Sequence, residues 1–244
     1  MDKMTWHDLI DFLPTLLRGL ATSLGISAVV IVFSVIAGVF VAFLRTSPYK
    51  FVRGPALAYV EFIRCTPALV QLYYIFYVIP IFGITLEALT AGIIAFTIIY
   101  TAYLSEVFRA AINSVAKTQV EAAISLGMSN SLARRLVIIP QAARVALPPT
   151  VNYLLSLIKD TSLLSIITIQ EIMFKGLILA SMTFKYFTIL TEVAFLYFCV
   201  CFPLTILARR LESKFERELG FNSSNGGKKK SFFSIGPWGA KNNE

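Results

Sequence analysis

The sequence predicts an all-α, polytopic membrane protein with five transmembrane helices, an external N-terminus and a cytoplasmic C-terminus. Two observations predict this class. Among 244 residues, 57% are hydrophobic and 15% are charged, whereas soluble domains contain about 45–50% apolar and about 25% charged residues. The apolar residues also form long runs, and about 20 consecutive apolar residues suffice for a helix to cross the bilayer core.

Five segments are long and apolar enough to be spans, at 20–44, 56–79, 86–108, 146–169 and 186–208. The first of them contains no charged residue. The second contains Glu61 and Arg64, the fourth contains Lys159 and Asp160, and the fifth contains a single Glu192. Charged groups inside a span are costly, so these five residues are expected to have specific partners or functions.

Lysine and arginine concentrate in alternate loops, and this asymmetry predicts the orientation. With the N-terminus outside, the inner segments carry about sixteen of these residues and the outer segments about four. The reverse topology would invert this ratio, so the loop at 117–140 and the C-terminus are placed in the cytoplasm.

A single transmembrane domain is expected over 1–220, followed by a disordered basic cytoplasmic tail over 221–244, where Asn, Ser, Gly and Lys dominate. The net charge of +8 fits a membrane surface, because the basic residues lie between and after the apolar runs. We therefore expect contact with membrane lipid and none with nucleic acid. The one histidine, His7, lies near the N-terminus, so no histidine-based metal or catalytic site is expected.

The inner loop at 117–140 predicts two short helices joined by a turn. Good helix formers lead up to Gly127, which can adopt a positive φ and end the first helix. Ser129 or Ser131 can cap the second helix, and Pro140 stops it or starts the next element. The residues by themselves leave two interpretations open, a plain helical connection or a surface that couples to a partner.

This loop resembles the EAA loop of the permeases of ATP-binding-cassette (ABC) importers. That signature is Glu-Ala-Ala, three residues, Gly, nine residues, and then Ile-x-Leu-Pro. In the same order and spacing, this chain carries Glu121, Ala122, Ala123, Gly127, Val137, Ile139 and Pro140. The two aliphatic positions differ conservatively.

The segments at 61–71, 103–110, 140–144 and 159–163 also resemble the permeases for polar amino acids, of the histidine, glutamine and arginine type. Cys65 replaces the glycine expected before Thr-Pro. The resemblance covers roughly residues 15–210, and five spans per subunit agrees with this subfamily.

The resemblance implies a type I ABC importer permease fold and inward transport of a polar or charged L-amino acid across the bacterial inner membrane. It implies a second permease subunit, identical or similar, two ATPase subunits that bind ATP and Mg, and an extracytoplasmic amino-acid-binding protein or domain. No cofactor is expected on this chain, and the chain is not expected to hydrolyse ATP, because it lacks the phosphate-loop pattern. The loop residues expected to couple to the ATPase are Glu121, Ala122, Ala123, Gly127, Arg134, Arg135 and Pro140.

Two acid–base pairs are expected within the spans, because Glu61 and Arg64, like Glu106 and Arg109, are three residues apart on one helical face. They serve either to fix helix packing or to form a network that links the spans to the coupling loop. Lys159 is adjacent in sequence to an acidic residue and projects about 100° away from it on a helix, so each needs a partner elsewhere.

Polar residues within or near the spans are candidates for the substrate path. Glu171 and Glu192 could meet an ammonium group or a basic side chain, and the resemblance implies a substrate-contacting segment at Glu171. The full set of candidates is Thr66, Leu69, Val70, Asn152, Asp160, Ser162, Glu171 and Glu192.

The alternative function is an ion-gradient-driven secondary amino-acid transporter or channel, with a proton path through Glu61, Asp160 and Glu192. The long helical inner loop and the lack of an internal repeat argue against it. A membrane scaffold without transport is a third interpretation, which the buried charges disfavour.

Overall fold

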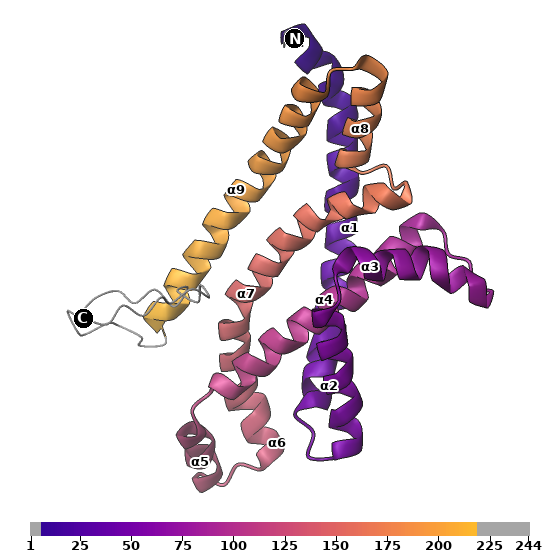
Figure 1. Ribbon diagram of the computed structural model, residues 1–244. Helices are drawn as coiled ribbons and strands as arrows, with labels where there is room; N and C mark the ends of the chain where they lie inside the picture. Colours follow the sequence, from indigo (N-terminus) through magenta and orange to yellow (C-terminus); the bar gives the residue numbers. More distant parts are fainter. Residues whose placement is uncertain (1–5, 219–244) are drawn as a thin grey trace, which may run out of the picture.

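The structure of the chain is a computed structural model, which describes residues 6–218. Within that range every regular element is helical (Figure 1). In chain order the elements are α1 (Trp6–Arg45), α2 (Lys50–Cys65), α3 (Ala68–Tyr73), η1 (Tyr74–Val78), η2 (Ile79–Phe82), α4 (Ala88–Ser114), α5 (Lys117–Ser125), α6 (Asn130–Ala133), η3 (Arg134–Ile138), α7 (Ile139–Asp160), η4 (Thr161–Ile167), α8 (Ile172–Thr183) and α9 (Tyr186–Glu218). The elements η1 and η3 are π-helical, and η2 and η4 are 3₁₀-helical.

Three helices in the described part are long and apolar enough to cross a membrane, namely Ile10–Arg45, Ala88–Ser114 and Tyr186–Lys214. They cover most of the first, third and fifth predicted spans. Two bent helix pairs supply the other two, so the count reaches five when each bent pair is one span. The predicted all-helical, polytopic membrane fold is therefore confirmed.

The second predicted span, 56–79, is broken rather than continuous. The helix axis bends by 108° between its two halves, Lys50–Cys65 and Ala68–Phe82. Thr66 is extended, with φ −109° and ψ 134°, because the ring of a following proline disfavours the helical conformation. The Gln71 amide nitrogen donates to the carbonyl oxygens of Ile63 at 2.9 Å and Thr66 at 2.8 Å. These bonds pair carbonyl groups that the break leaves without helical partners.

Two other prolines in the chain are each preceded by a π turn. The N–H of Ile79, next to Pro80, donates to the carbonyl of Tyr74, and the N–H of Ile139, next to Pro140, donates to the carbonyl of Arg134. Proline has no N–H and its ring clashes with the carbonyl four residues earlier. The wider π turn makes room for the ring, so in both places the helix continues past the proline.

The fourth predicted span, 146–169, is part of a longer broken element. Its helix begins earlier, at Ile139, and ends at Asp160, where a 3₁₀ turn takes over. Thr168 then takes a left-handed conformation with φ 63° and ends the turn, and α8 follows at an overall bend of 51°. After this break α8 extends to Thr183, well beyond the predicted end of the span.

Close packing joins these elements into one bundle. Helix α1 lies along α4, α7 packs against both α4 and α9, and α8 packs against α1 and α9. A Cβ atom on Gly19 would lie 2.7 Å from the Cα of Ile172, and one on Gly92 would lie 2.9 Å from a methyl group of Leu164. Small residues at these crossings allow α1 to approach α8 and α4 to approach η4.

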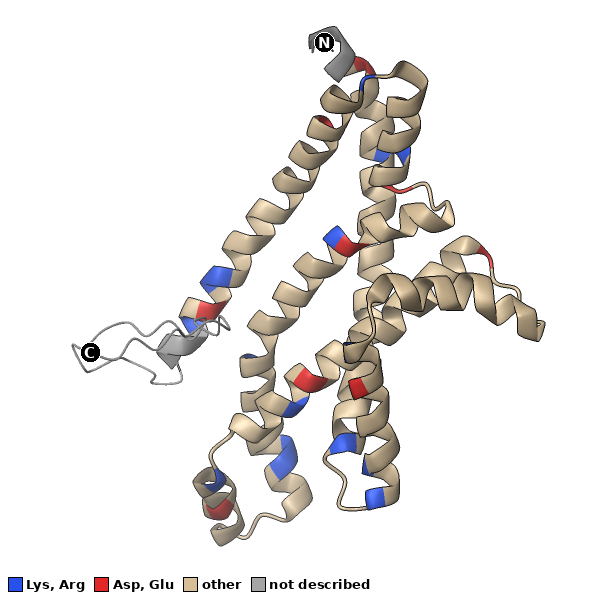
Figure 2. Cartoon of the chain, viewed as in Figure 1, with Lys and Arg blue, Asp and Glu red and all other residues tan. Residues whose placement is uncertain are grey.

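Several connections fall at the two ends of the bundle. The start of α1 and the α8–α9 connection share one end, whereas the α1–α2 connection and the α5–α6 hairpin share the other (Figure 1). Lys and Arg gather at the second end, on α2, α4 and the hairpin (Figure 2). This distribution supports the predicted orientation, with the hairpin in the cytoplasm.

Candidate functional site

The hairpin between α4 and α7 begins with α5, which ends as the sequence predicts. Gly127 has φ +83°, its N–H donates to the carbonyl of Ile124 at 2.9 Å, and the N–H of Met128 donates to that of Ala123 at 3.1 Å. This pair of bonds is a Schellman motif, which requires a left-handed residue after the helix. The expectation of a positive φ at Gly127 is confirmed.

The second half of the hairpin differs from the prediction in one respect. The Ser129 hydroxyl accepts a bond from the N–H of Leu132 at 3.3 Å and so caps α6, as expected. However, α6 is not a separate short helix, because it continues through η3 into α7. Pro140 lies in the first turn of α7, where the preceding π turn accommodates its ring. The hairpin is therefore joined rigidly to the fourth span.

The hairpin exposes apolar side chains to solvent. Ala123 and Ala133 are buried between its two arms, whereas Leu126 is 81% exposed and Leu136 is 57% exposed. Exposed apolar groups on a polar surface are typical of sites that contact another protein or the membrane. The other loop residues singled out by sequence are also exposed, namely Glu121, Ala122, Gly127, Arg134, Arg135 and Pro140.

A charge network lies directly above the hairpin, at the inner end of α4. Glu106 bonds with Arg109, as the spacing predicts. It also lies 2.6 Å from Arg45, the last residue of α1, whose side chain is 5% exposed. The sequence did not point to Arg45 as a partner of Glu106, because no periodicity relates residues on two different helices.

The second predicted pair is looser. The guanidinium of Arg64 lies 3.9 Å from the Glu61 carboxylate, and the two side chains are 41% and 53% exposed. Together with the network above they enclose a cleft of about 310 Å³. The residues that line it are Arg45, Arg53, Leu57, Glu61, Arg64, Glu106 and Arg109.

Asp160 finds its partner on the third span. The hydroxyl of Tyr100 donates to its carboxylate at 2.8 Å. Tyr100 packs edge-on against Tyr103 and Tyr153, which stack on each other at 5.6 Å with ring planes 13° apart. Tyr153 in turn interacts electrostatically with Arg64 and Glu106. A polar trail thus runs from the middle of the bundle to the arginine-lined cleft.

Lys159 faces the other side of α7. It lines a cavity of about 490 Å³ between α7, α8 and α9, together with Ser162 and Tyr197. Asn152 also faces α9, where its amide donates to the Glu212 carboxylate at 3.1 Å. The candidates on the fourth span are therefore divided between two faces, with Asp160 on the α4 side.

Glu171 lies at the N-terminus of α8 and holds that end of the helix. It is fully buried and caps α8, because its carboxylate accepts bonds from the N–H groups of Phe174 at 2.7 Å and Met173 at 2.9 Å. The hydroxyls of Tyr197 at 3.3 Å and Ser23 at 3.4 Å add further bonds. All these bonds come from the protein itself, and a role of Glu171 in the substrate path stays a prediction.

The remaining candidates lie in two places. Thr66, Leu69 and Val70 are at the break of the second span, where Thr66 is half-buried and its hydroxyl donates to the carbonyl of Phe62 at 2.8 Å. Glu192 is 7% exposed on α9, and its Oε2 has no hydrogen-bond partner among the described residues.

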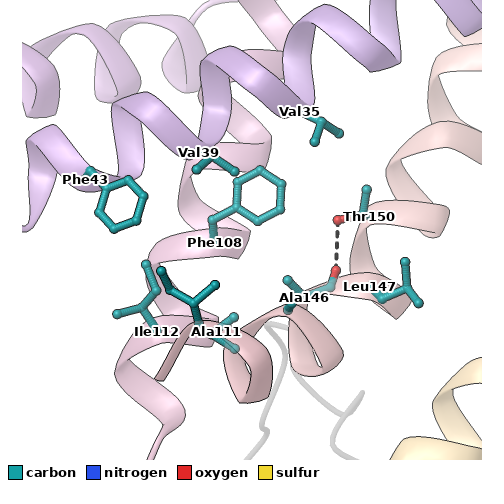
Figure 3. Close-up of a pocket in the computed structure, with 12 residues that line it drawn as sticks. Val35, Val39, Phe43, Phe108, Ala111, Ile112, Ala146, Leu147 and Thr150 are labelled. Atoms are coloured by element: carbon teal, nitrogen blue, oxygen red, sulfur yellow. Dashed lines mark hydrogen bonds between the residues drawn. The ribbon is translucent and has the colours of Figure 1, made fainter. Parts of the chain in front are cut away.

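An apolar cavity of about 290 Å³ lies between α1, α4 and α7 (Figure 3). Its single hydroxyl, on Thr150, donates to the carbonyl of Ala146 at 2.8 Å. Every other side chain in its lining is apolar, so the cavity offers no group to bind a polar solute and lies apart from the trail.

Comparisons with known proteins agree with this architecture. Residues 34–217 match the family described as binding-protein-dependent transport system inner membrane component. The chain is 37% identical over 206 residues to the "Probable amino-acid ABC transporter permease protein YckA" of Bacillus subtilis (strain 168), covering 84% of this chain and 91% of YckA. It is 37% identical over 208 residues to the L-cystine transport system permease protein TcyB of the same organism, covering 85% and 89%.

A solved structure shows the same fold. The crystal structure of an amino acid ABC transporter with histidines superposes with a TM-score of 0.82 at 33% identity, covering 88% of this chain and 99% of the other. These matches set aside the ion-driven transporter and the scaffold as alternatives. The chain belongs to the family of binding-protein-dependent transport system inner membrane components, and it is the permease subunit of an ABC transporter.

Proposed function

We propose that this permease carries a polar amino acid inward and that its hairpin is the handle through which a separate ATPase drives the transport. The single observation that carries this proposal is the continuity of the hairpin with the fourth span. The exposed apolar tip at Leu126 leads through the turn at Gly127 into a helical path that runs without a break from Asn130 to Asp160. A partner that moves the hairpin therefore also moves α7, which is continuous with it inside the membrane.

Two ATPase subunits, a second permease subunit and an extracytoplasmic binding protein complete the proposed importer. Each ATPase subunit receives one hairpin in a cleft. Closure of the ATPase pair on ATP then shifts the permease pair between outward-open and inward-open states, because the closed ATPase pair binds one state better. The residues proposed to touch the ATPase are those exposed on the hairpin, namely Glu121, Ala122, Gly127, Arg134, Arg135 and Pro140.

The substrate path is proposed to follow the polar trail on the α4 side of α7. It begins at the broken second span, near Thr66, Leu69 and Val70, since irregular backbone at membrane depth is tolerated where it lines a cavity. It passes Asp160 and the faces of the three tyrosines, which attract an ammonium group. Broken spans of this kind mark binding sites in other transporters.

The substrate class is supported by the relatives. TcyB is named for L-cystine, and the solved structure holds histidines. The path offers one carboxylate and aromatic faces near the middle of the bundle and arginines near its inner end. Such a set of groups suits a small zwitterion better than an apolar solute, so a polar amino acid is the proposed cargo.

The proposal is tested by reconstituting the chain with its ATPase subunit and binding protein in vesicles. Uptake of radiolabelled L-cystine, L-histidine and L-glutamine is measured with and without ATP. Leu126→Ser should abolish co-purification of the ATPase, whereas Met182→Ser, at a residue 73% exposed on the opposite end of the bundle, should leave it intact. Uptake that needs no ATP, or ATPase binding that survives Leu126→Ser, would contradict the proposal.

A further inference from the structure

We infer that the arginine-lined cleft at the inner ends of α1, α2 and α4 is a second substrate station, which binds the α-carboxylate of the amino acid on its way to the cytoplasm. This inference rests on the proposed transport function. It concerns a place separate from the middle of the bundle, because neither Asp160 nor any of the three tyrosines lines the cleft.

The charges of the cleft are unbalanced toward the positive. Its lining contains four arginines and two glutamates, and Glu106 is already shared by Arg45 and Arg109. Arg53 forms no ion pair with any described residue. The separation of 3.9 Å between Arg64 and Glu61 is too long for a hydrogen bond. The guanidinium groups of Arg53 and Arg64 therefore keep free donors that face the cleft.

A buried donor also lacks an acceptor here. Arg45 is 8% exposed, and its Nε is buried without a hydrogen-bond partner among the described residues. A buried nitrogen in this condition has a desolvation cost that no hydrogen bond from the described residues offsets. Because Arg45 lines the cleft, an anion bound there would lie beside this incompletely bonded guanidinium.

The size and chemistry of the cleft fit an amino acid. Its volume of about 310 Å³ lies at the small end of the range for small-molecule sites, roughly 300–1,000 Å³. Guanidinium groups bind carboxylates through two parallel hydrogen bonds, so Arg64 or Arg53 suits the α-carboxylate. The Glu61 carboxylate, 53% exposed beside Arg64, suits the α-ammonium group. A zwitterion bound between Arg64 and Glu61 would contact both side chains, which form no hydrogen bond with each other.

The cleft is also connected to the proposed path. Tyr153 interacts electrostatically with both Arg64 and Glu106, and it stacks on Tyr103. The aromatic face thus lies between Asp160 and the arginines of the cleft. Binding from the cytoplasmic side would hold the permease in its inward-open state and slow its return.

The test uses vesicles that contain the whole transporter, with the ATPase facing the lumen. Whichever of L-histidine, L-cystine and L-glutamine is taken up best with ATP serves as the probe. Absence of ATP-driven uptake of all polar amino acids would refute the proposed function itself. With uptake established, unlabelled probe inside the lumen should lower the initial rate, and its α-amide, which lacks the carboxylate, should not.

Arg64→Gln and Arg53→Gln should each raise the luminal concentration for half-inhibition about tenfold, the value of one charged hydrogen bond. Both side chains are exposed enough to be replaced without unfolding, which a thermal transition checks. Lys50→Gln is the matched control, because it removes the same charge from the same helix outside the cleft. Arg64→Lys should be intermediate, since it keeps the charge and loses the paired donors.

Two results would overturn the inference. One is equal inhibition by the amino acid and its α-amide, or equal inhibition of wild type and both arginine variants. The other concerns a lipid phosphate, which also binds arginine. If the arginine variants differ from wild type only in vesicles that contain phosphatidylglycerol, and not in phosphatidylcholine alone, the cleft holds a lipid headgroup and not the substrate.

Discussion

The carboxylate of Glu106 lies 2.6 Å from the guanidinium of Arg45, and this ion pair joins the inner ends of α1 and α4. Glu106 also bonds with Arg109, in the last part of α4 before the chain enters the hairpin. The first span is therefore tied to the helix that positions the hairpin, close to the surface where an ATPase would act.

Replacement of Glu106 by Gln should destabilise the protein by about 2 kcal/mol, because it leaves the buried Arg45 charge with a neutral partner. Thermal unfolding in detergent measures the loss. Glu61→Gln is the matched control and should cost less than about 0.5 kcal/mol, since its pair with Arg64 is exposed and long. An equal loss of stability in the two variants would show that the Arg45–Glu106 pair contributes no more to stability than the exposed Glu61–Arg64 pair.

Replacement of Gly127 by Val should disconnect ATP hydrolysis from transport. A side chain at φ +83° strains the backbone by about 1–2 kcal/mol, and the branched Val would distort the Schellman turn that shapes the hairpin. ATP-driven uptake should fall at least about tenfold, while the protein still inserts into the membrane.

Two further substitutions sharpen this test. Gly127→Asn should keep most of the uptake, because Asn tolerates the left-handed conformation. Gly25→Ala should have no effect, since a Cβ there meets no atom within 4 Å. Normal uptake by Gly127→Val would argue against a coupling role for the hairpin.

Replacement of Asp160 by Asn should abolish transport and leave the fold intact. The Asn carbonyl can still accept the bond from Tyr100, which is 2.8 Å long in the native structure, but the negative charge that attracts an ammonium group is gone. Uptake should fall at least about tenfold, with an unchanged thermal transition. Lys159→Gln, which alters the other face of α7, should reduce uptake less. The reverse ranking would place the path between α7 and α9.

Replacement of Glu171 by Ala should lower stability by about 1–2 kcal/mol, because α8 loses its N-cap. Glu171→Gln keeps a carbonyl acceptor and should lose less. Neither variant should change which amino acid is preferred, since the carboxylate is fully buried and bonded within the protein. Competition among amino acids for uptake measures this preference. A change of preference without a loss of stability would return Glu171 to the substrate path.

Much of this fold follows from local features of the sequence. The three straight spans follow from the length of their apolar runs, because a bilayer leaves such segments no other solvent. The turn at Gly127 and the cap at Ser129 follow from bonds between residues a few positions apart. The pair Glu106–Arg109 follows from the helical period, which brings residues three apart onto one face.

Other features depend on how the helices pack and were set by the tertiary structure alone. The extended conformation of Thr66 has a local cause, the proline that follows it. The bend of 108° between the two helices depends on the elements packed around them. Three features depend on how whole helices are rotated about their axes. They are the ion pair of Arg45 with Glu106, the burial of Glu171, and the positions of Lys159 and Asp160 on opposite faces of α7. A sequence fixes which residues share a face of one helix, whereas the neighbours of that face are chosen by close packing between segments far apart in the chain.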